Sequence, residues 1–273
     1  MASSASNIPS PTGGARIELR GVGVTYAAGT TAVRDVDLDI AAGEFAVFLG
    51  PSGSGKSTLL RTINRLIEPT SGTVLIDGVD VRTLDAVTLR RGIGYVIQAV
   101  GLFAHLTIGT NVGVVPALLG WDRARIARRV DELLALVRLD PATYRDRYPR
   151  QLSGGEQQRA GVARALAAEP RVLLMDEPFG AVDAIVRASL QDEIRRIHRD
   201  LGTTIVFVTH DVDEALRLAD RVVVIAGGEI AQADTPARVL AAPANETVRS
   251  LVGIDAESRG FAVARPLLDR EPR

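Results

Sequence analysis

Residues 45–57 read FAVFLGPSGSGKS, and this stretch decides the fold. Its first part, Phe45–Leu49, is a continuous apolar run of the kind found in strands. A glycine-rich loop follows, and from Lys56 to about Leu66 the sequence has the pattern of a helix. A strand that passes through a glycine-rich loop directly into a helix favours an α/β architecture.

The segments on both sides extend this α/β pattern. In the second half, apolar runs at 172–176 and 203–210 alternate with helical patterns at 184–200 and 211–219, which predicts a mostly parallel sheet. Residues 221–234 read as a hairpin. The strand-rich early residues predict an antiparallel subdomain. Two helices separated by a Pro and Gly break are expected between 107 and 138.

Composition gives the domain limits and excludes several classes of protein. The Ser/Pro/Gly/Ala-rich residues 1–15 are expected to be flexible, residues 16–244 to form the domain with a helical subdomain at about 100–160, and residues 245–273 to form a tail. The 46% apolar and 24% charged residues exclude wholesale disorder. The chain has no cysteine, which excludes disulfides, thiol catalysis and Cys-ligated metals.

The net charge and the hydropathy of the chain indicate where in the cell the protein can act. Lys and Arg number 32 against 33 Asp and Glu, so no strong overall field attracts nucleic acid or an anionic membrane. The longest apolar stretch, Val112–Trp121, is about half the length of a bilayer span and contains Pro116. The first residues have no signal-peptide pattern. The protein is therefore expected to stay where it is made, and any work on a membrane would need a partner chain.

The glycine-rich loop matches the P-loop pattern G-x-x-x-x-G-K-[ST]. Glycines let successive backbone N–H groups point at an anion, and the following helix adds its positive N-terminal end. The Lys56 ammonium can reach the β- and γ-phosphates of a nucleotide, and the Ser57 hydroxyl can ligate Mg²⁺. The candidate nucleotide-binding residues here are Gly50, Pro51, Ser52, Gly53, Ser54, Gly55, Lys56, Ser57 and Thr58.

Two adjacent carboxylates stand at the end of the apolar run VLLMD at 172–176: Asp176 is its last residue and Glu177 follows it. Asp176 is expected to hold Mg²⁺, through a water, and Glu177 to act as the general base that polarises the attacking water. An acidic strand end alone is weak evidence, because strands often end in acids. Its combination with the P-loop makes the metal-and-base interpretation the stronger one.

Residues 152–156 read LSGGE, twenty residues before the end of VLLMD. With the P-loop and the acid pair in this order, the sequence resembles the nucleotide-binding subunits of ABC transporters. Ser153, Gly154 and Gly155 can form a second anion site at a helix N-terminus. The resemblance implies that this site completes the ATP pocket of another chain, so that two copies form a homodimer with two composite sites.

Other positions match the family pattern, and their roles are implied by the resemblance alone. Tyr26 matches the aromatic residue that stacks on adenine, and Gln98 the glutamine that contacts Mg²⁺ and senses the membrane partner. Asp183 matches the aspartate that bridges the dimer, and His210 the histidine that contacts the γ-phosphate and positions Glu177. The chain departs from the pattern where Glu156 replaces Gln and where Gly180 and Val182 replace Ser and Leu. The resemblance implies an active Mg²⁺-dependent ATPase.

The runs IGYVIQAVGLFAHLT at 93–107 and NVGVVP at 111–116 are similar to the ATPase subunits of osmoprotectant importers. This similarity implies uptake of glycine betaine, choline, carnitine or proline, on the cytoplasmic side of the cell membrane. The implied partners are transmembrane permease subunits and, indirectly, a substrate-binding protein. Another small-solute importer and a lipid or lipoprotein exporter are the alternatives. A non-transport ATPase that remodels nucleic acid or a complex is a third, disfavoured by the neutral charge and the lack of a coiled coil.

Overall fold

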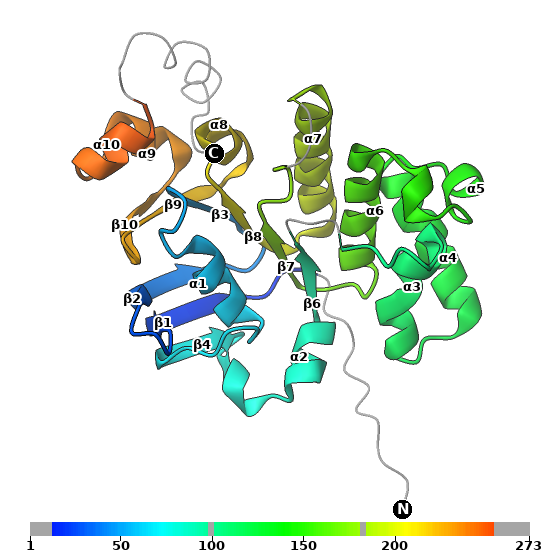
Figure 1. Cartoon of the computed structure of the whole chain (residues 1–273), viewed down its shortest axis with the longest axis horizontal. Helices are drawn as coiled ribbons and strands as arrows, with labels where there is room; N and C mark the ends of the chain where they lie inside the picture. Colours follow the sequence, from blue (N-terminus) through cyan, green and yellow to red (C-terminus); the bar gives the residue numbers. More distant parts are fainter. Residues whose placement is uncertain (1–12, 98–100, 181–183, 254–273) are drawn as a thin grey trace, which may run out of the picture.

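The computed structural model of the chain describes residues 13–97, 101–180 and 184–253 (Figure 1). The strands are β1 (Ile17–Thr25), β2 (Thr31–Ile40), β3 (Phe45–Leu49), β4 (Ser71–Ile76), β5 (Val79–Asp80), β6 (Ile93–Val96), β7 (Val172–Asp176), β8 (Thr204–Thr209), β9 (Arg221–Ala226) and β10 (Glu229–Asp234). The α-helices are α1 (Lys56–Ile63), α2 (Ala86–Arg91), α3 (Ile108–Leu118), α4 (Arg123–Leu136), α5 (Pro141–Tyr144), α6 (Gly154–Leu166), α7 (Ala184–Leu201), α8 (Val212–Leu218), α9 (Pro236–Ala241) and α10 (Glu246–Leu251).

Within the described ranges the strands form two sheets. The larger has the order β10-β9-β3-β8-β7-β6, and every neighbouring pair except the β9–β10 hairpin is parallel. The smaller has the order β2-β1-β4-β5 and is antiparallel. The expected mostly parallel core with an antiparallel N-terminal subdomain is confirmed. The loops after β3, β7 and β8 therefore emerge at one carboxyl edge, where open α/β sheets bind ligands.

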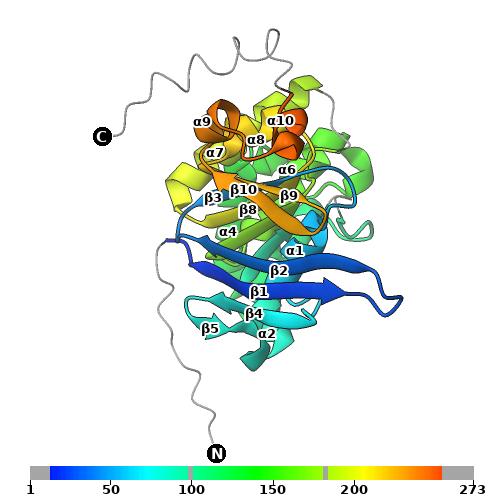
Figure 2. The same cartoon turned by 90° about the vertical axis from the view of Figure 1, so that its left-hand side faces the viewer.

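The central strand β3 is buried on both faces, which explains its unbroken apolar sequence. Phe45, Val47 and Leu49 pack on the side of α6, α7 and α8, whereas Ala46 and Phe48 pack on the side of α1. Helix α1 lies between the two sheets (Figure 2). Its apolar residues Leu59, Leu60 and Ile63 are each at most 1% exposed. Burial of each such side chain stabilises the fold by about 1.5–3 kcal/mol, so the apolar face of the P-loop helix fixes it to the core.

Helices α3, α4 and α6 pack together beside this core (Figure 1). The expected break between two helices lies at residues 119–122 and includes Gly120, which has a φ of 76°. Pro116 was expected in the break but lies inside α3. A proline removes its own N–H bond and crowds the carbonyl of the preceding turn, and here only two residues of α3 follow it. Gly113 allows the close approach of α4, because a Cβ there would lie 2.8 Å from Ile126 Cγ2.

Both ends of the domain differ from the expected limits. Residues 13–15 were expected to be flexible, but Ala15 is 1% exposed. Its carbonyl accepts a 2.7 Å hydrogen bond from Thr204 Oγ1, and Arg171 Nη2 donates to Gly14 O at 2.6 Å. These two bonds hold the residues against the core. At the other end, helix α10 lies beyond residue 244, where a weakly patterned tail was expected, and buries Val248.

No helix in residues 13–97, 101–180 or 184–253 has both the length and the apolar character that crossing a membrane requires.

Candidate functional site: a nucleotide-binding edge

The P-loop connects β3 to α1 at the carboxyl edge of the large sheet. Gly55 is the N-cap of α1 and has a φ of 100°, a left-handed conformation that favours glycine. Lys56 is 4% exposed. Its Nζ donates to the carbonyls of Gly50 and Pro51 at 2.7 and 2.8 Å. Burial lowers the pKa of Lys56, and the charges of Glu177 and Asp176 oppose that shift. The ammonium is therefore held at the loop that would receive phosphate.

Asp176 ends β7 and is 3% exposed. Ser57 Oγ donates to its Oδ1 at 2.7 Å, and Arg61 Nη2 donates to its Oδ2 at 3.0 Å. Tyr95 OH lies 3.5 Å from the same Oδ2. The motifs predicted that Ser57 and Asp176 would share a site, and the structure places them in contact. Arg61 and Tyr95 were not among the predicted site residues. The i, i+4 spacing of Ser57 and Arg61 on one helix could have indicated the arginine, whereas no sequence signal indicated Tyr95.

The chemistry of this pair fits Mg²⁺. Within the described part of the chain, no group of three or more His, Asp or Glu side chains could form an all-protein metal cage. Mg²⁺ is commonly bound instead through one or two protein oxygens, with phosphate oxygens and waters as its other ligands. Ser57 Oγ and Asp176 Oδ1 are two adjacent oxygens beside the phosphate loop. The third expected metal ligand, Gln98, lies outside the described residues.

Glu177 and His210 meet at the same edge. His210 Nδ1 lies 3.3 Å from Glu177 Oε2. The register of the parallel strands explains this contact, because Asp176 pairs with Val208 and the residues that follow each strand emerge side by side. The Glu177 N–H donates to Val208 O at 3.0 Å, and Glu177 has a positive φ of 44°. The chain therefore turns sharply at Glu177, and this turn aims the carboxylate at the imidazole.

Tyr26 follows β1 and is 43% exposed. Its hydroxyl lies 3.0 Å from Thr58 Oγ1, so the ring is tied to the first turn of α1. The expected adenine-stacking residue is thus adjacent to the P-loop helix and keeps an accessible ring. Asp183, expected to bridge a dimer, lies outside the described residues, as does Val182.

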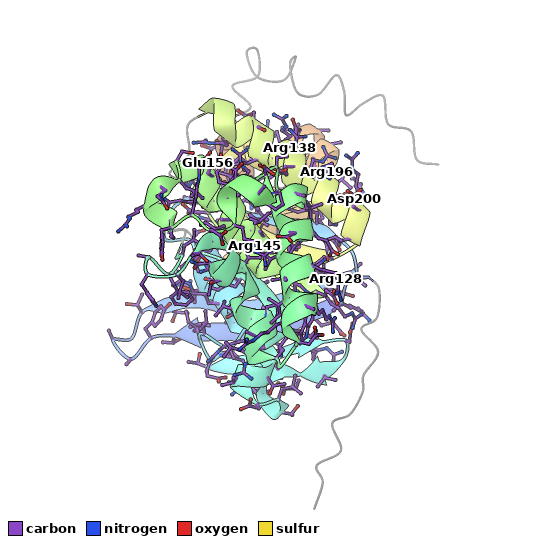
Figure 3. The ribbon with its side chains drawn as sticks, turned by 90° about the vertical axis from the view of Figure 1, so that its right-hand side faces the viewer. Arg128, Arg138, Arg145, Glu156, Arg196 and Asp200 are labelled. Carbon is purple, nitrogen blue, oxygen red and sulfur yellow. The ribbon has the colours of Figure 1, made fainter. Side chains whose placement is uncertain are left out.

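Ser153 begins helix α6 as its N-cap. The Glu156 N–H donates to Ser153 Oγ at 3.4 Å, and the Ser153 N–H donates to Glu156 Oε2 at 2.7 Å, which completes a capping box. The Tyr144 hydroxyl and the Ser153 N–H hold the pKa of Glu156 below its usual range. The unusual glutamate thus stabilises the start of α6. Figure 3 shows Glu156 on the face that carries α4 and α6.

The structure does not bring Ser153, Gly154 and Gly155 to the P-loop of the same chain. Figure 1 shows α6 and α1 on opposite sides of β6 and β7. Ser153 and Gly154 are exposed, and a Cβ at Gly154 would meet nothing within 4 Å. The residues of the predicted second anion site are therefore accessible from outside and separate from the P-loop.

This fold and this edge together define a P-loop nucleotide-binding domain. The ABC transporter family model matches residues 33–180. The chain belongs to this family as an ATP-binding domain, which confirms the resemblance stated from the motifs.

Three comparisons give the extent of the similarity. Over 237 residues the chain is 55% identical to the glycine betaine/carnitine/choline transport ATP-binding protein OpuCA of Bacillus subtilis, covering 87% of this chain and 62% of OpuCA. It is 54% identical to the glycine betaine uptake system ATP-binding protein YehX of Escherichia coli, covering 81% of this chain and 72% of YehX. The dimeric ATP-binding cassette MJ0796, solved with ADP and Pi, matches with a TM-score of 0.73 and 34% identity, over 81% of this chain and 98% of MJ0796. The chain thus spans about three fifths of the length of OpuCA.

Proposed function

We propose that this chain hydrolyses ATP to power a membrane importer of osmoprotectants. The observation that carries the ATPase proposal is the arrangement at one sheet edge. Ser57 contacts Asp176 at 2.7 Å beside the buried Lys56, and His210 contacts Glu177 at 3.3 Å. These are the group types that phosphoryl transfer needs, because its catalysis is mainly positioning and electrostatic stabilisation.

Each residue has a distinct part in the proposed reaction. The glycine-rich backbone and Lys56 bind the phosphates, and Tyr26 stacks on the adenine. Ser57 and Asp176 would hold Mg²⁺, which when bound neutralises charge on the β- and γ-phosphates. Glu177 accepts a proton from the attacking water, and His210 orients Glu177 and contacts the γ-phosphate.

A homodimer would complete the site. The open Ser153–Gly155 helix start of one copy can close over the γ-phosphate held by the P-loop of the other. The dimeric state of MJ0796 supports this arrangement, since that cassette was solved as a dimer with ADP and Pi. The isologous symmetry of such a pair would generate two equivalent composite sites from one P-loop and one LSGGE per chain.

The dimer can be tested with a variant that binds ATP but hydrolyses it slowly. Glu177→Gln should form an ATP-dependent dimer, measured by light scattering. Adding Gly154→Asp should abolish that dimer while ATP binding persists, because the new side chain meets nothing in its own chain and repels the partner's phosphate. Adding Glu246→Asn, an exposed change on α10, should leave the dimer intact. A Glu177→Gln, Gly154→Asp protein that still dimerises with ATP would contradict the composite site.

The proposed cargo is a quaternary amine such as glycine betaine, choline or carnitine, or proline. The names of OpuCA and YehX support this class. We propose that the chain acts on the cytoplasmic side of the cell membrane, bound to transmembrane permease subunits and indirectly coupled to a substrate-binding protein. In proteoliposomes that contain the assembled transporter, glycine betaine with its binding protein should stimulate ATP hydrolysis.

The alternatives make different predictions in the same measurement. Stimulation by another small solute, or by a lipid or lipoprotein, would replace the osmoprotectant assignment and keep the ATPase proposal. Stimulation by DNA without any permease would replace transport altogether. The catalytic edge is common to all these ATPases, so only the partner chains separate them.

A further inference from the structure

A buried polar cluster lies directly behind His210. Its members are Thr209 at the end of β8, Gln191 on α7 and Glu214 on α8, which are 2%, 5% and 6% exposed. Thr209 Oγ1 donates to Glu214 Oε2 at 2.6 Å, and Gln191 Nε2 donates to Glu214 Oε1 at 3.4 Å. Burial raises the pKa of Glu214, because a carboxylate loses its hydration there. The two hydrogen bonds offset part of the cost of burying this acid.

The cluster holds the chain on both sides of His210. The Asp211 N–H donates to Thr209 Oγ1 at 3.0 Å, so one hydroxyl connects the Glu214 carboxylate to the residue after the histidine. Asp211 in turn caps α8, since its Oδ1 accepts from the N–H groups of Asp213 and Glu214. Arg187 lies on α7, with its Nε 3.8 Å from Glu214 Oε1 and its Nη1 3.4 Å from Asp211 Oδ2. The residues before and after His210 are thus fixed to α7 and α8.

His210 itself is poorly held by packing. Its side chain is 58% exposed, and its Nδ1 faces Glu177 Oε2 at 3.3 Å. A cavity of about 70 Å³ adjoins the pair and is lined in part by Glu177, Thr209, His210 and Glu214. An imidazole with so little packing takes its orientation from its backbone, and the cavity leaves room for it to turn if the backbone shifts.

We propose that Glu214 is a positioning residue, whose carboxylate fixes Thr209 and so keeps the His210 imidazole on Glu177. This inference rests on the ATPase function proposed above. In this role Glu214 acts through its neighbours and not by contact with the nucleotide or the attacking water. Its effect is transmitted through one hydroxyl and the two peptide units around His210. A misplacement of a catalytic group by about 1 Å can reduce the rate by about 10²-fold, so a small backbone shift would suffice.

Substitutions of the two hydrogen-bonded partners test this path. Glu214→Ala and Thr209→Val each remove the bond and should lower kcat at least about tenfold, while the KM for ATP changes less than about twofold. Glu214→Gln keeps an acceptor for this hydrogen bond, and Thr209→Ser keeps its donor. Both variants should retain most of kcat. Equal loss of kcat in Glu214→Ala and Glu214→Gln would overturn the proposal, because then the hydrogen bond to Thr209 is not what matters.

A double-variant cycle separates positioning from general damage. If Glu214 acts through His210, Glu214→Ala should lower kcat no further once His210→Ala is present. The same tenfold loss in both backgrounds would overturn the proposal. Glu246→Gln, on the exposed surface of α10, is the control that should leave kcat unchanged.

A readout without ATP distinguishes failure of this inference from failure of the ATPase proposal. The chain has three histidines, so the imidazole nitrogens of His210 can be assigned by NMR with a His210→Gln reference. Glu214→Ala should shift the Nδ1 resonance of His210 and leave those of His105 and His198 in place. An unchanged His210 spectrum would overturn the positioning role even if the protein hydrolyses ATP. A shifted spectrum in a protein that does not hydrolyse ATP would refute the ATPase proposal alone.

Discussion

His210 Nδ1 lies 3.3 Å from Glu177 Oε2, although 32 positions separate the two residues in the sequence. The contact exists because β7 and β8 are parallel neighbours in register, with Asp176 opposite Val208. Each residue follows its strand directly, so both side chains emerge at the carboxyl edge beside the P-loop. This geometry is the basis of the first prediction.

Glu177→Gln should reduce ATP turnover by at least about 10²-fold, since an amide cannot accept the proton of the attacking water. ATP should still bind, because Lys56 and the P-loop are untouched. Steady-state hydrolysis and equilibrium binding of ATP measure the two effects separately. A wild-type rate in Glu177→Gln would show that another group is the base.

Tyr26→Ala should weaken ATP binding about tenfold or more, as expected for loss of one base–aromatic stack. Tyr26→Phe keeps the ring and loses only the 3.0 Å contact with Thr58, so its affinity should remain near that of the wild type. Inorganic tripolyphosphate, which has no base, is the control ligand. If Tyr26→Ala weakens tripolyphosphate binding equally, the tyrosine supports the loop and does not stack on adenine.

Gly55→Ala and Gly53→Ala form a matched pair in the P-loop. Both glycines have positive φ, but a Cβ at Gly55 would lie 2.2 Å from Ala32 O, whereas a Cβ at Gly53 would meet nothing within 4 Å. Gly53→Ala should therefore cost about 1–2 kcal/mol of the free energy of unfolding. Gly55→Ala adds a backbone clash and should cost at least about 3 kcal/mol. Equal Tm values for the two variants would refute this difference.

Glu193 is another buried acid, placed where α7 meets the end of α4. It is 2% exposed, and neither carboxylate oxygen has a hydrogen-bond partner among the described residues. Arg138 Nε and Arg196 Nη2 lie 3.6 and 3.7 Å from its Oε1. Figure 3 shows these two arginines near one another on that face. Burial raises the pKa of Glu193 above its ordinary value of 4.5, and the nearby arginines oppose the shift only in part.

The raised pKa of Glu193 fixes the sign of a pH effect. Between 4.5 and the folded-state pKa, the folded state binds more protons than the unfolded state, so stability falls as pH rises through that window. Glu193→Gln removes this loss. Its Tm should therefore rise relative to that of the wild type as the pH increases above 4.5, with each 1 kcal/mol worth about 2–4 °C.

The neighbouring change Asp192→Asn, at a side chain that is 63% exposed, is the control for Glu193→Gln and should keep the wild-type pH dependence. A Tm difference between Glu193→Gln and the wild type that is constant with pH would contradict the prediction.

The sequence alone was sufficient for the features that depend on neighbouring residues. The strand–loop–helix of residues 45–66, the hairpin at 221–234 and the buried strand at 172–176 were predicted because apolar spacing and glycines report directly on local backbone and burial. The order of P-loop, LSGGE and acid pair was enough for the family. Expectations failed where contacts override composition, as at Ala15, which the core buries despite its Gly-rich surroundings.

Only the tertiary structure decided which distant side chains meet. Arg61 and Tyr95 reach Asp176, and Gln191 reaches Glu214, because strand order, register and helix packing bring separate segments together. The separation of Ser153 from the P-loop of its own chain likewise follows from where α6 packs. Local spacing alone does not determine these pairings, since they depend on which strands lie side by side and on which helices cover them.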